Sequence, residues 1–336
     1  MNYSNQIDTT PALSPEAAAA LYETTPVDIA VIGGGPAGCS AAINGRTRGR
    51  SAVILSGDYR NSPLYKASVV ENMPGLPGKS GAQLLDLFHE HAASLGCVYF
   101  KGRALVVMPT DFGSSKTGPN PGFQVAYGNQ FLMARSVILT TGVAAAKPYP
   151  GEDKYLGRGV SYCATCDGML YRGRDVAVIA KSGDAVEEAL HLSKIGCKVT
   201  LFVNPADLKR WNISLPDNTF VRVLNSSGFK IEGDDFVSHI VTDQETIAVT
   251  GIFILRSTIA LGSLLSGLAL DNSYIRTDKS MSTNIPGVFA AGDCTGKPLQ
   301  IAKALGEGLV AALSADTYLT AREAAASAHT QKDGIK

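Results

Sequence analysis

The 336-residue chain carries no excess of charge of either sign and contains no long hydrophobic run. Its 30 Lys and Arg residues balance 30 Asp and Glu residues, so the overall charge does not favour binding to nucleic acid or to an anionic membrane. No apolar stretch approaches the roughly 20 residues that a membrane-spanning helix needs. Residues 1–23 are polar and acidic and lack the basic start and apolar middle of a secretory signal. We therefore expect a cytoplasmic protein with neither nucleic acid nor a membrane as a partner.

Cysteine is too scarce to form a disulfide scaffold, because the chain has only six. Two of them, Cys163 and Cys166, lie three positions apart, and in a reducing cytosol such a pair is more often catalytic or metal-binding than structural. A zinc site would need a second Cys or His pair at ligand spacing, and the chain has no H-x₃₋₅-H pattern. We therefore expect no metal site. The remaining cysteines are expected to be buried, inert thiols: Cys39, Cys97, Cys197 and Cys294.

The first nucleotide-binding pattern begins at residue 27. An apolar run at 27–32 leads into the glycine-rich segment 33–38 (GGGPAG), and a helix of small residues and a second apolar run follow. Strand, turn, helix and strand in this order predict the opening of a dinucleotide-binding fold. Gly33 permits the tight turn, Gly35 lets a pyrophosphate approach the backbone, and Gly38 lets the helix pack closely on the strand. The phosphates would lie at the positive end of the helix.

The acidic ribose ligand that usually follows about 20 residues later is missing. Ser56 occupies that place, and Asp58 comes slightly too late. We therefore expect the Ser56 hydroxyl or backbone groups to bind the ribose.

The same strand-turn-helix-strand pattern returns at residues 175–203, between linker-like segments at 147–159 and 257–278. A last helix is expected at about 300–318. The predicted fold class is α/β, with two Rossmann-like domains of three layers (ββα), the second inserted into a discontinuous first domain. The expected divisions are a flexible N-terminal extension (1–25), a discontinuous first domain (26–148 and 279–320), an inserted domain (149–278) and a polar tail (321–336).

The pair Cys163 and Cys166 can form a small disulfide that a partner thiolate opens through a mixed disulfide. Asp167 follows the second thiol directly and is placed to donate or accept a proton during the exchange.

Five separated motifs together resemble the low-molecular-weight thioredoxin reductases from about residue 28 to about residue 318. They are residues 33–38 (GGGPAG), 71–75 (ENMPG), 140–142 (TTG), 163–168 (CATCDG) and 287–294 (GVFAAGDC). The resemblance implies FAD in the discontinuous domain, thioredoxin as the partner, and a homodimer.

The resemblance also implies roles for individual residues. Asn72 would lie near the flavin, Asp293 would bind the ribityl chain and Gln300 would meet the isoalloxazine end. Cys166 would lie nearest the flavin, and Cys163 would attack the partner. Gly35, Pro36 and Ala37 would hold the pyrophosphate. The remaining expected FAD contacts are Gly33, Gly38, Ser56, Ala104, Gly142 and Ile301.

The second nucleotide motif departs from the family. The family has G-x-G-x-x-A where residues 180–185 read AKSGDA, so that Ala180 and Ser182 replace two glycines. Asp184 brings a negative charge to the helix start, where it is also expected to form a capping box with Glu187. The family's His-Arg-Arg cluster, which reads the NADP 2′-phosphate, is replaced by VNP at residues 203–205.

A smaller family has this pattern: the ferredoxin-dependent flavin thioredoxin reductases, which residues 292–298 (GDCTGKP) and 306–308 (GEG) resemble. This resemblance implies that ferredoxin supplies the electrons. Lys66, Lys297 and Lys303 are candidate contacts for an acidic ferredoxin.

Other interpretations remain open. Another hydride donor is one: NADH, a deazaflavin, or NADPH at an altered site where Lys181, Lys209 and Arg210 compensate. A dithiol oxidase is another. A third is a redox-sensing binding module without activity, which the intact C-x-x-C-D disfavours.

Overall fold

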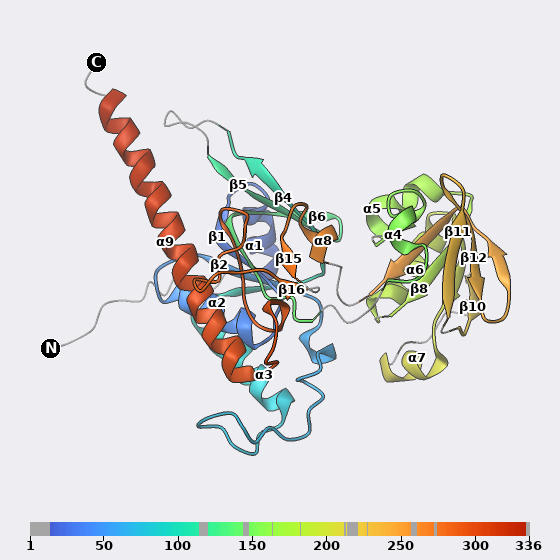
Figure 1. Ribbon diagram of the computed structural model, residues 1–336, viewed down its shortest axis with the longest axis horizontal. Helices are drawn as coiled ribbons and strands as arrows, with labels where there is room; N and C mark the ends of the chain where they lie inside the picture. Colours follow the sequence, from blue (N-terminus) through green and yellow to red (C-terminus); the bar gives the residue numbers. More distant parts are fainter. Residues whose placement is uncertain are drawn as a thin grey trace. The chain divides into compact units, whose positions relative to one another are not determined.

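The computed structural model describes residues 14–113, 120–143, 148–162, 164–181, 183–211, 213, 221–226, 228–256, 261–271 and 274–333. It divides into two compact units, one of Met1–Ala144 with Ala260–Lys336 and the other of Ala145–Ile259 (Figure 1). In the described part of the chain, no helix combines the length and the apolar character needed to cross a bilayer.

The first unit is built on a seven-stranded sheet of order β3-β2-β1-β6-β5-β4, in which β17 also pairs with β6. The strands are β1 (Val27–Ile32), β2 (Ala52–Ser56), β3 (Val98–Lys101), β4 (Ala104–Asp111), β5 (Pro121–Tyr127), β6 (Gln130–Leu139) and β17 (Val288–Ala290). β1 is parallel to β2 and β6, and β17 is parallel to β6. In this register Leu139 pairs with both Ile32 and Ala290, so the carboxyl ends of β1, β6 and β17 meet at one edge of the sheet.

Three long helices cover this sheet: α2 (Pro36–Arg46), α3 (Gly81–Ser94) and α9 (Ile301–Asp333). A capping box of Ser80 and Gln83 satisfies backbone N–H groups at the start of α3. α2 packs against both other helices (Figure 1). Gly308 permits the close approach of α9, because a Cβ there would lie 2.3 Å from the Ala37 carbonyl oxygen. The remaining short helices are α1 (Pro15–Tyr22), η1 (Tyr59–Asn61), α8 (Leu261–Leu264) and η3 (Asp293–Thr295).

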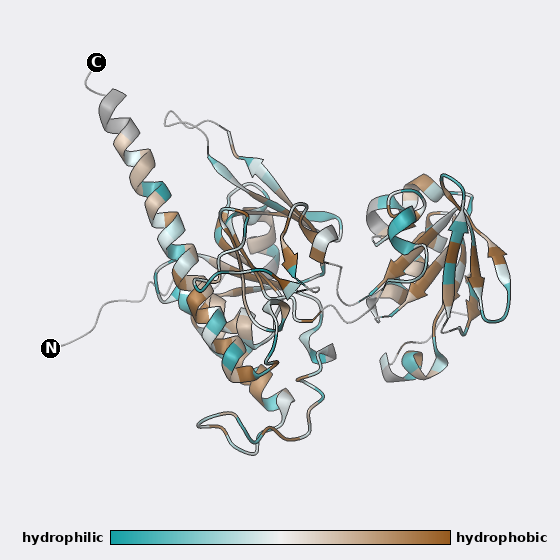
Figure 2. Cartoon of the chain, in the orientation of Figure 1, coloured by the Kyte–Doolittle hydropathy of each residue, from teal (hydrophilic) through white to brown (hydrophobic). Residues whose placement is uncertain are grey.

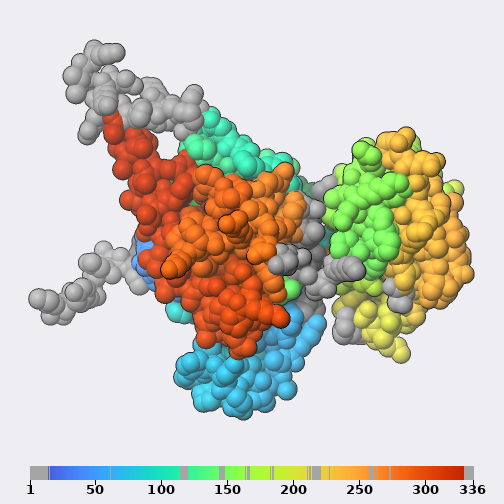
Figure 3. Space-filling view, in the orientation of Figure 1, coloured from blue at the N-terminus to red at the C-terminus, as the bar shows by residue number. Residues whose placement is uncertain are grey.

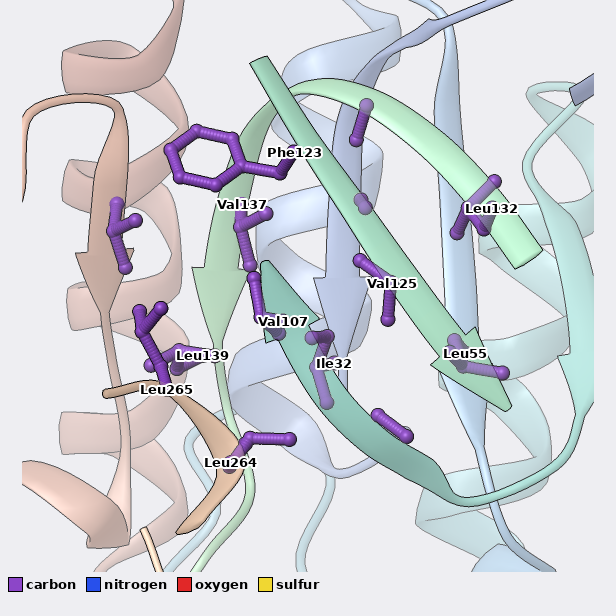
Figure 4. Close-up of a cluster of buried hydrophobic side chains, with 14 of the residues drawn as sticks. Ile32, Leu55, Val107, Phe123, Val125, Leu132, Val137, Leu139, Leu264 and Leu265 are labelled. Carbon is purple, nitrogen blue, oxygen red and sulfur yellow. The ribbon is translucent and has the colours of Figure 1, made fainter. Parts of the chain in front are cut away.

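The core of the first unit joins its two chain segments. Figure 4 shows Leu264 and Leu265 of the second segment packed with Leu139 and Ile32 of the first, and all four are buried. Burying one such side chain stabilises the fold by roughly 1.5–3 kcal/mol. Figure 3 shows the blue-to-teal and orange-to-red parts of the chain in one body.

The second unit has three layers. Its parallel sheet has the order β10-β9-β8-β14-β7 and comprises β7 (Val160–Ser161), β8 (Asp175–Ala180), β9 (Lys198–Phe202), β10 (Val221–Leu224) and β14 (Gly251–Leu255). An antiparallel sheet consists of β11 (Phe229–Gly233), β12 (Val237–Thr242) and β13 (Thr246–Ala248). The helices of the second unit are α4 (Glu152–Tyr155), α5 (Ala164–Asp167), η2 (Gly168–Tyr171), α6 (Asp184–Lys194) and α7 (Pro205–Trp211). The two remaining strands, β15 (Leu270–Asp271) and β16 (Tyr274–Ile275), pair with each other and belong to the first unit.

Alternation along β8 shows why the layers form. Val176 and Val178 belong to one buried cluster with residues of α6, whereas Ala177 and Ile179 belong to another with residues of β11 and β12. Successive side chains of a strand point to opposite faces, so one apolar strand serves both layers. The strands are accordingly brown at the centre of the unit in Figure 2. The α/β fold class predicted from the sequence is confirmed.

The predictions for the two ends of the chain, a flexible extension and a last helix that stops near residue 318, are wrong in part. Residues 15–22 form α1 instead of a flexible extension: the Ser14 hydroxyl accepts from the Ala17 N–H, and Ala18 is fully buried in the core. At the other end, α9 continues beyond residue 318 to Asp333. Arg50 explains part of this extension, because it pairs with Asp316 and Glu323 at 2.7 Å each.

Candidate active site

The glycine-rich turn between β1 and α2 has the geometry of an anion site. Gly33 adopts φ +121°, and a Cβ there would lie 2.2 Å from the Thr140 carbonyl oxygen. A Cβ on Gly38 would lie 1.9 Å from the Gly33 carbonyl oxygen. At Gly35 a Cβ would meet nothing within 4 Å, and no side chain caps the helix that starts there. The first N–H groups of α2 are therefore available to a bound phosphate.

His89 of α3 anchors this turn, a contact that sequence reasoning missed. Its Nε2 lies 2.8 Å from the Gly34 carbonyl oxygen, and its ring stacks on Tyr59 with centroids 3.9 Å apart. Burial lowers the pKa of His89, which favours a neutral ring donating from Nε2. No sequence signal could have identified this role, because an isolated polar residue on an amphipathic helix is usually solvent-facing.

The end of β2 offers no acidic ribose ligand. Asp58 accepts from the Arg60 N–H at 3.0 Å and so caps its own short helix η1. Ser56 lies beside the glycine turn, since its Oγ would be 3.2 Å from a Cβ on Gly34. Ser56 thus lies next to the turn that would hold the pyrophosphate, and its role as a ribose ligand stays a prediction.

Residues from the second chain segment complete this edge. β17 leads into the turn of residues 292–296, and a Cβ on Gly292 would lie 2.8 Å from the Ala37 side chain. Asp293 is half-buried there, and burial raises its pKa. The Asn72 amide donates to Gln300 Oε1 at 2.7 Å, directly before α9. The fold thus brings together residues more than 200 positions apart.

The other residues expected to contact FAD also lie in the first unit. Pro36 and Ala37 form the first turn of α2, and Ile301 begins α9. Gly142 follows β6 with φ +72°, and Ala104 is buried at the start of β4.

The expected dithiol belongs to the second unit. Cys163 lies outside the described residues, and Cys166 lies in α5. Asp167 Oδ2 accepts from Ser161 Oγ at 2.7 Å, which ties the end of α5 to β7. Glu188 of α6 accepts from the Ala164 N–H at 3.0 Å, which ties its start. The residues flanking the cysteines are thus held on both sides.

A buried ion pair holds the residue before Cys163. Arg256 makes a bidentate pair with Glu152, and the Tyr162 hydroxyl donates to the same carboxylate at 2.9 Å. Glu152 is only 1% exposed, and removing one partner of a buried pair typically costs about 3–5 kcal/mol. Sequence reasoning missed this pair, whose members lie about 100 positions apart.

Apolar side chains lie beside Gly183 in the second nucleotide motif. Gly183 precedes α6 and a Cβ there would lie 3.5 Å from the Trp211 ring and 3.6 Å from Ile213. Both residues pack against the core of the unit. The expected capping box of Asp184 and Glu187 is wrong: the helix begins one residue earlier than that motif requires, with Gly183 as its uncapped N-cap residue. Ser182 lies outside the described residues.

The four remaining cysteines are buried, as predicted. Burial raises the pKa of Cys39 and of Cys97 to about 12 and that of Cys294 to about 11. Burial also raises the pKa of Cys197.

We expect a charged alkylating reagent to label only Cys163 and Cys166 in the folded, reduced protein. At pH 8 a pKa of about 12 leaves about one thiolate in 10,000, and the thiolate is the reactive form. Mass spectrometry of labelled peptides checks this, with urea-unfolded protein as the control in which all six react. Fast labelling of Cys39 or Cys97 in the folded protein would contradict it.

Comparison with known proteins places the chain. Residues 27–308 match the model of the pyridine nucleotide-disulphide oxidoreductase family. A thioredoxin reductase of Listeria monocytogenes is 32% identical over 308 residues, covering 87% of this chain and 93% of the relative. A ferredoxin-flavin thioredoxin reductase structure from Clostridium acetobutylicum is 33% identical with a TM-score of 0.77, covering 89% of this chain and 99% of the other. A thioredoxin reductase structure from Gloeobacter violaceus is 28% identical with a TM-score of 0.74, covering 88% and 95%.

The chain therefore belongs to the pyridine nucleotide-disulphide oxidoreductase family. More particularly, it is a member of the low-molecular-weight thioredoxin reductase family, an FAD-dependent disulfide oxidoreductase. The residues of the first unit fit FAD. Open space at Gly35 and the uncapped start of α2 suit a pyrophosphate, while Asp293 after β17 and the bonded pair Asn72 and Gln300 before α9 supply polar groups.

Proposed function

We propose that this enzyme reduces thioredoxin through Cys163 and Cys166, with electrons that reach FAD from reduced ferredoxin and not from NADPH. The observation that carries the choice of donor is the contrast between the two helix starts. A Cβ at Gly35 would meet open space, whereas a Cβ at Gly183 would touch Trp211 and Ile213. The first helix start has room for a pyrophosphate, and apolar side chains stand against the second.

The replaced motif residues support the same conclusion. Ala180 ends β8 where the family has the first glycine, and Asn204 and Pro205 follow β9 where the family has arginine. Neither Asn204 nor Pro205 can form the bidentate contact that arginine makes with phosphate. The similarity to a structure named as a ferredoxin-flavin thioredoxin reductase points in the same direction.

The proposed dithiol chemistry balances two electrons and two protons. When bound, FAD supplies a carrier of one or two electrons, which matches a one-electron donor to a two-electron disulfide. Two electrons and two protons open the Cys163–Cys166 disulfide to two thiols, and the Asp167 carboxylate relays one of these protons from solvent to the Cys166 sulfur. Cys163 then loses its proton to solvent, and its thiolate attacks the thioredoxin disulfide. Cys166 resolves the mixed disulfide, which re-forms the Cys163–Cys166 disulfide and leaves thioredoxin with two thiols.

The energetics permit this direction of flow. A plant-type ferredoxin lies near −400 mV, and thioredoxin lies near −270 mV. The difference of about 130 mV corresponds to roughly 6 kcal/mol downhill for two electrons.

The prediction that Lys303 contacts ferredoxin is wrong. Lys303 is only 17% exposed and donates to backbone carbonyl oxygens of its own unit, so it is unavailable to a partner. Lys66 and Lys297 are exposed and remain candidates for binding an acidic ferredoxin. The cytoplasmic location and the homodimer stay predictions from the sequence.

Anaerobic flavin spectroscopy tests the donor. We expect reduced ferredoxin to bleach the flavin absorbance rapidly, and NADPH and NADH to do so at least about 100-fold more slowly, because phosphate recognition at α6 is lost. An NADPH-dependent thioredoxin reductase in the same apparatus is the positive control. Rapid bleaching by NADPH would overturn the proposed donor while leaving the dithiol chemistry intact.

A further inference from the structure

Two side chains of α9, Lys303 and Glu307, hold the turn that carries Asp293. Lys303 Nζ donates to the carbonyl oxygens of Gly292 at 2.9 Å and Gly296 at 2.8 Å. Glu307 Oε2 accepts from the Gly292 N–H at 2.8 Å. We call these two side chains the α9 clasp.

Thr295 bonds to both side chains of the α9 clasp, and these two side chains also form an ion pair with each other. The Thr295 hydroxyl lies 3.0 Å from Lys303 Nζ and 2.9 Å from Glu307 Oε2, and the two charged groups lie 3.0 Å apart. Both side chains are less than one fifth exposed. A charge-assisted hydrogen bond that is shielded from water is stronger than an exposed one. The clasp is therefore a firm restraint on the turn.

The turn depends on these side chains because of its backbone conformation. Gly292 has φ +86° and Gly296 has φ +122°, both outside the range of a regular helix or strand. At Gly292 the N–H and the carbonyl oxygen both bond to the clasp. Side chains of α9 thus hold the backbone on which Asp293 lies, between the two glycines.

The α9 clasp also places opposite charges beside Asp293. Burial raises the pKa of Asp293, Lys303 opposes that rise and Glu307 adds to it. The local electrostatic potential therefore depends on the balance between one ammonium and one carboxylate. Removing either partner leaves the other charge poorly screened at a partly buried position.

We propose that Lys303 and Glu307 are positioning residues for FAD, and that their opposite charges set how readily the bound flavin is reduced. This inference rests on FAD binding by the family and is independent of the identity of the electron donor. Reduction adds electrons to the flavin, so a nearby cation favours the reduced form and a nearby anion disfavours it. The two side chains consequently act in opposite directions on the potential.

The test is a spectroscopic redox titration of the flavin against dyes of known potential, with FAD content measured on the same samples. Lys303→Met is expected to shift the reduction equilibrium about tenfold toward oxidised flavin, a midpoint lower by about 30 mV. It is also expected to release FAD about tenfold faster, because the turn loses two hydrogen bonds to its carbonyl oxygens. Lys279→Met removes an exposed lysine of the same unit and is the matched control.

Glu307→Gln separates charge from shape, since it keeps an oxygen that can accept from the Gly292 N–H. We expect its midpoint potential to rise, opposite to that of Lys303→Met, with FAD retained. Because this variant preserves the turn, the test survives if Lys303→Met fails to bind FAD. Shifts of both variants in the same direction, or a shift of Glu307→Gln no larger than that of Lys279→Met, would overturn the proposal.

Discussion

Replacing Cys166 with serine is expected to lower thioredoxin turnover by about 1,000-fold or more, the scale of loss when a covalent catalyst is removed. The serine hydroxyl cannot form the disulfide that receives electrons, so the cycle stops at flavin reduction. The Cys163→Ser variant should be equally inactive. Steady-state turnover with reduced ferredoxin and thioredoxin measures the loss.

The two variants should differ in what they trap. With Cys166 gone, the Cys163 thiolate can still attack thioredoxin, but the enzyme has no second thiol to complete the transfer, and only the thiol released on thioredoxin can reverse it. A covalent adduct that reducing agent releases is expected for Cys166→Ser and not for Cys163→Ser, visible by non-reducing electrophoresis. In both variants the flavin should still be reduced by the donor, which confirms that the first unit is intact. The reverse pattern of adducts would exchange the roles of the two cysteines.

Gly38→Ala is expected to lower the free energy of unfolding by about 1–3 kcal/mol or more and to abolish FAD binding. Its Cβ would lie 1.9 Å from the Gly33 carbonyl oxygen, so either α2 or the glycine turn must move. Overpacking of this kind typically costs about 1–3 kcal/mol. Urea unfolding of the FAD-free protein gives the stability, and titration with FAD gives the affinity.

Gly35→Ala is the matched comparison because it adds the same methyl group into open space. Gly35 has φ −79°, which alanine adopts freely, so we expect stability within about 0.5 kcal/mol of wild type. FAD affinity should nevertheless fall, because the methyl group stands where the pyrophosphate approaches the backbone. Unchanged affinity in Gly35→Ala would contradict the placement of the pyrophosphate, and wild-type stability in Gly38→Ala would contradict the close packing.

The elements nearest the glycine turn could be predicted from sequence because their signals are local. The apolar run 27–32, the glycines that follow and the small residues of α2 are consecutive, and they adopt β1, the turn and α2 as expected. The spacing of Cys163 and Cys166 likewise needs no tertiary information. The loss of phosphate-binding residues after β8 and β9 could be read in the same way.

The extent of the terminal helices could not be predicted from local signals. Residues 15–22 are helical because Ala18 is buried against the sheet, where α1 packs on β3 and β6, two strands that lie far away in the sequence. The later part of α9 reads as a polar tail, yet Glu323 pairs with both Arg50 and Arg135 at 2.7 Å. These partners lie far away in sequence, so a helix of ordinary polarity becomes part of the folded unit.

By itself, the sequence determined the fold class, the glycine turn and the family, and it predicted the reactive pair Cys163 and Cys166, because each depends on residue types at short, regular spacings. Only the tertiary structure decided which side chains surround those motifs. His89 bonds to the glycine turn, Trp211 covers the start of α6, and Lys303 bonds to the turn at Asp293 instead of facing a partner. Such contacts arise from strand order and helix packing, which bring together residues without any common local pattern.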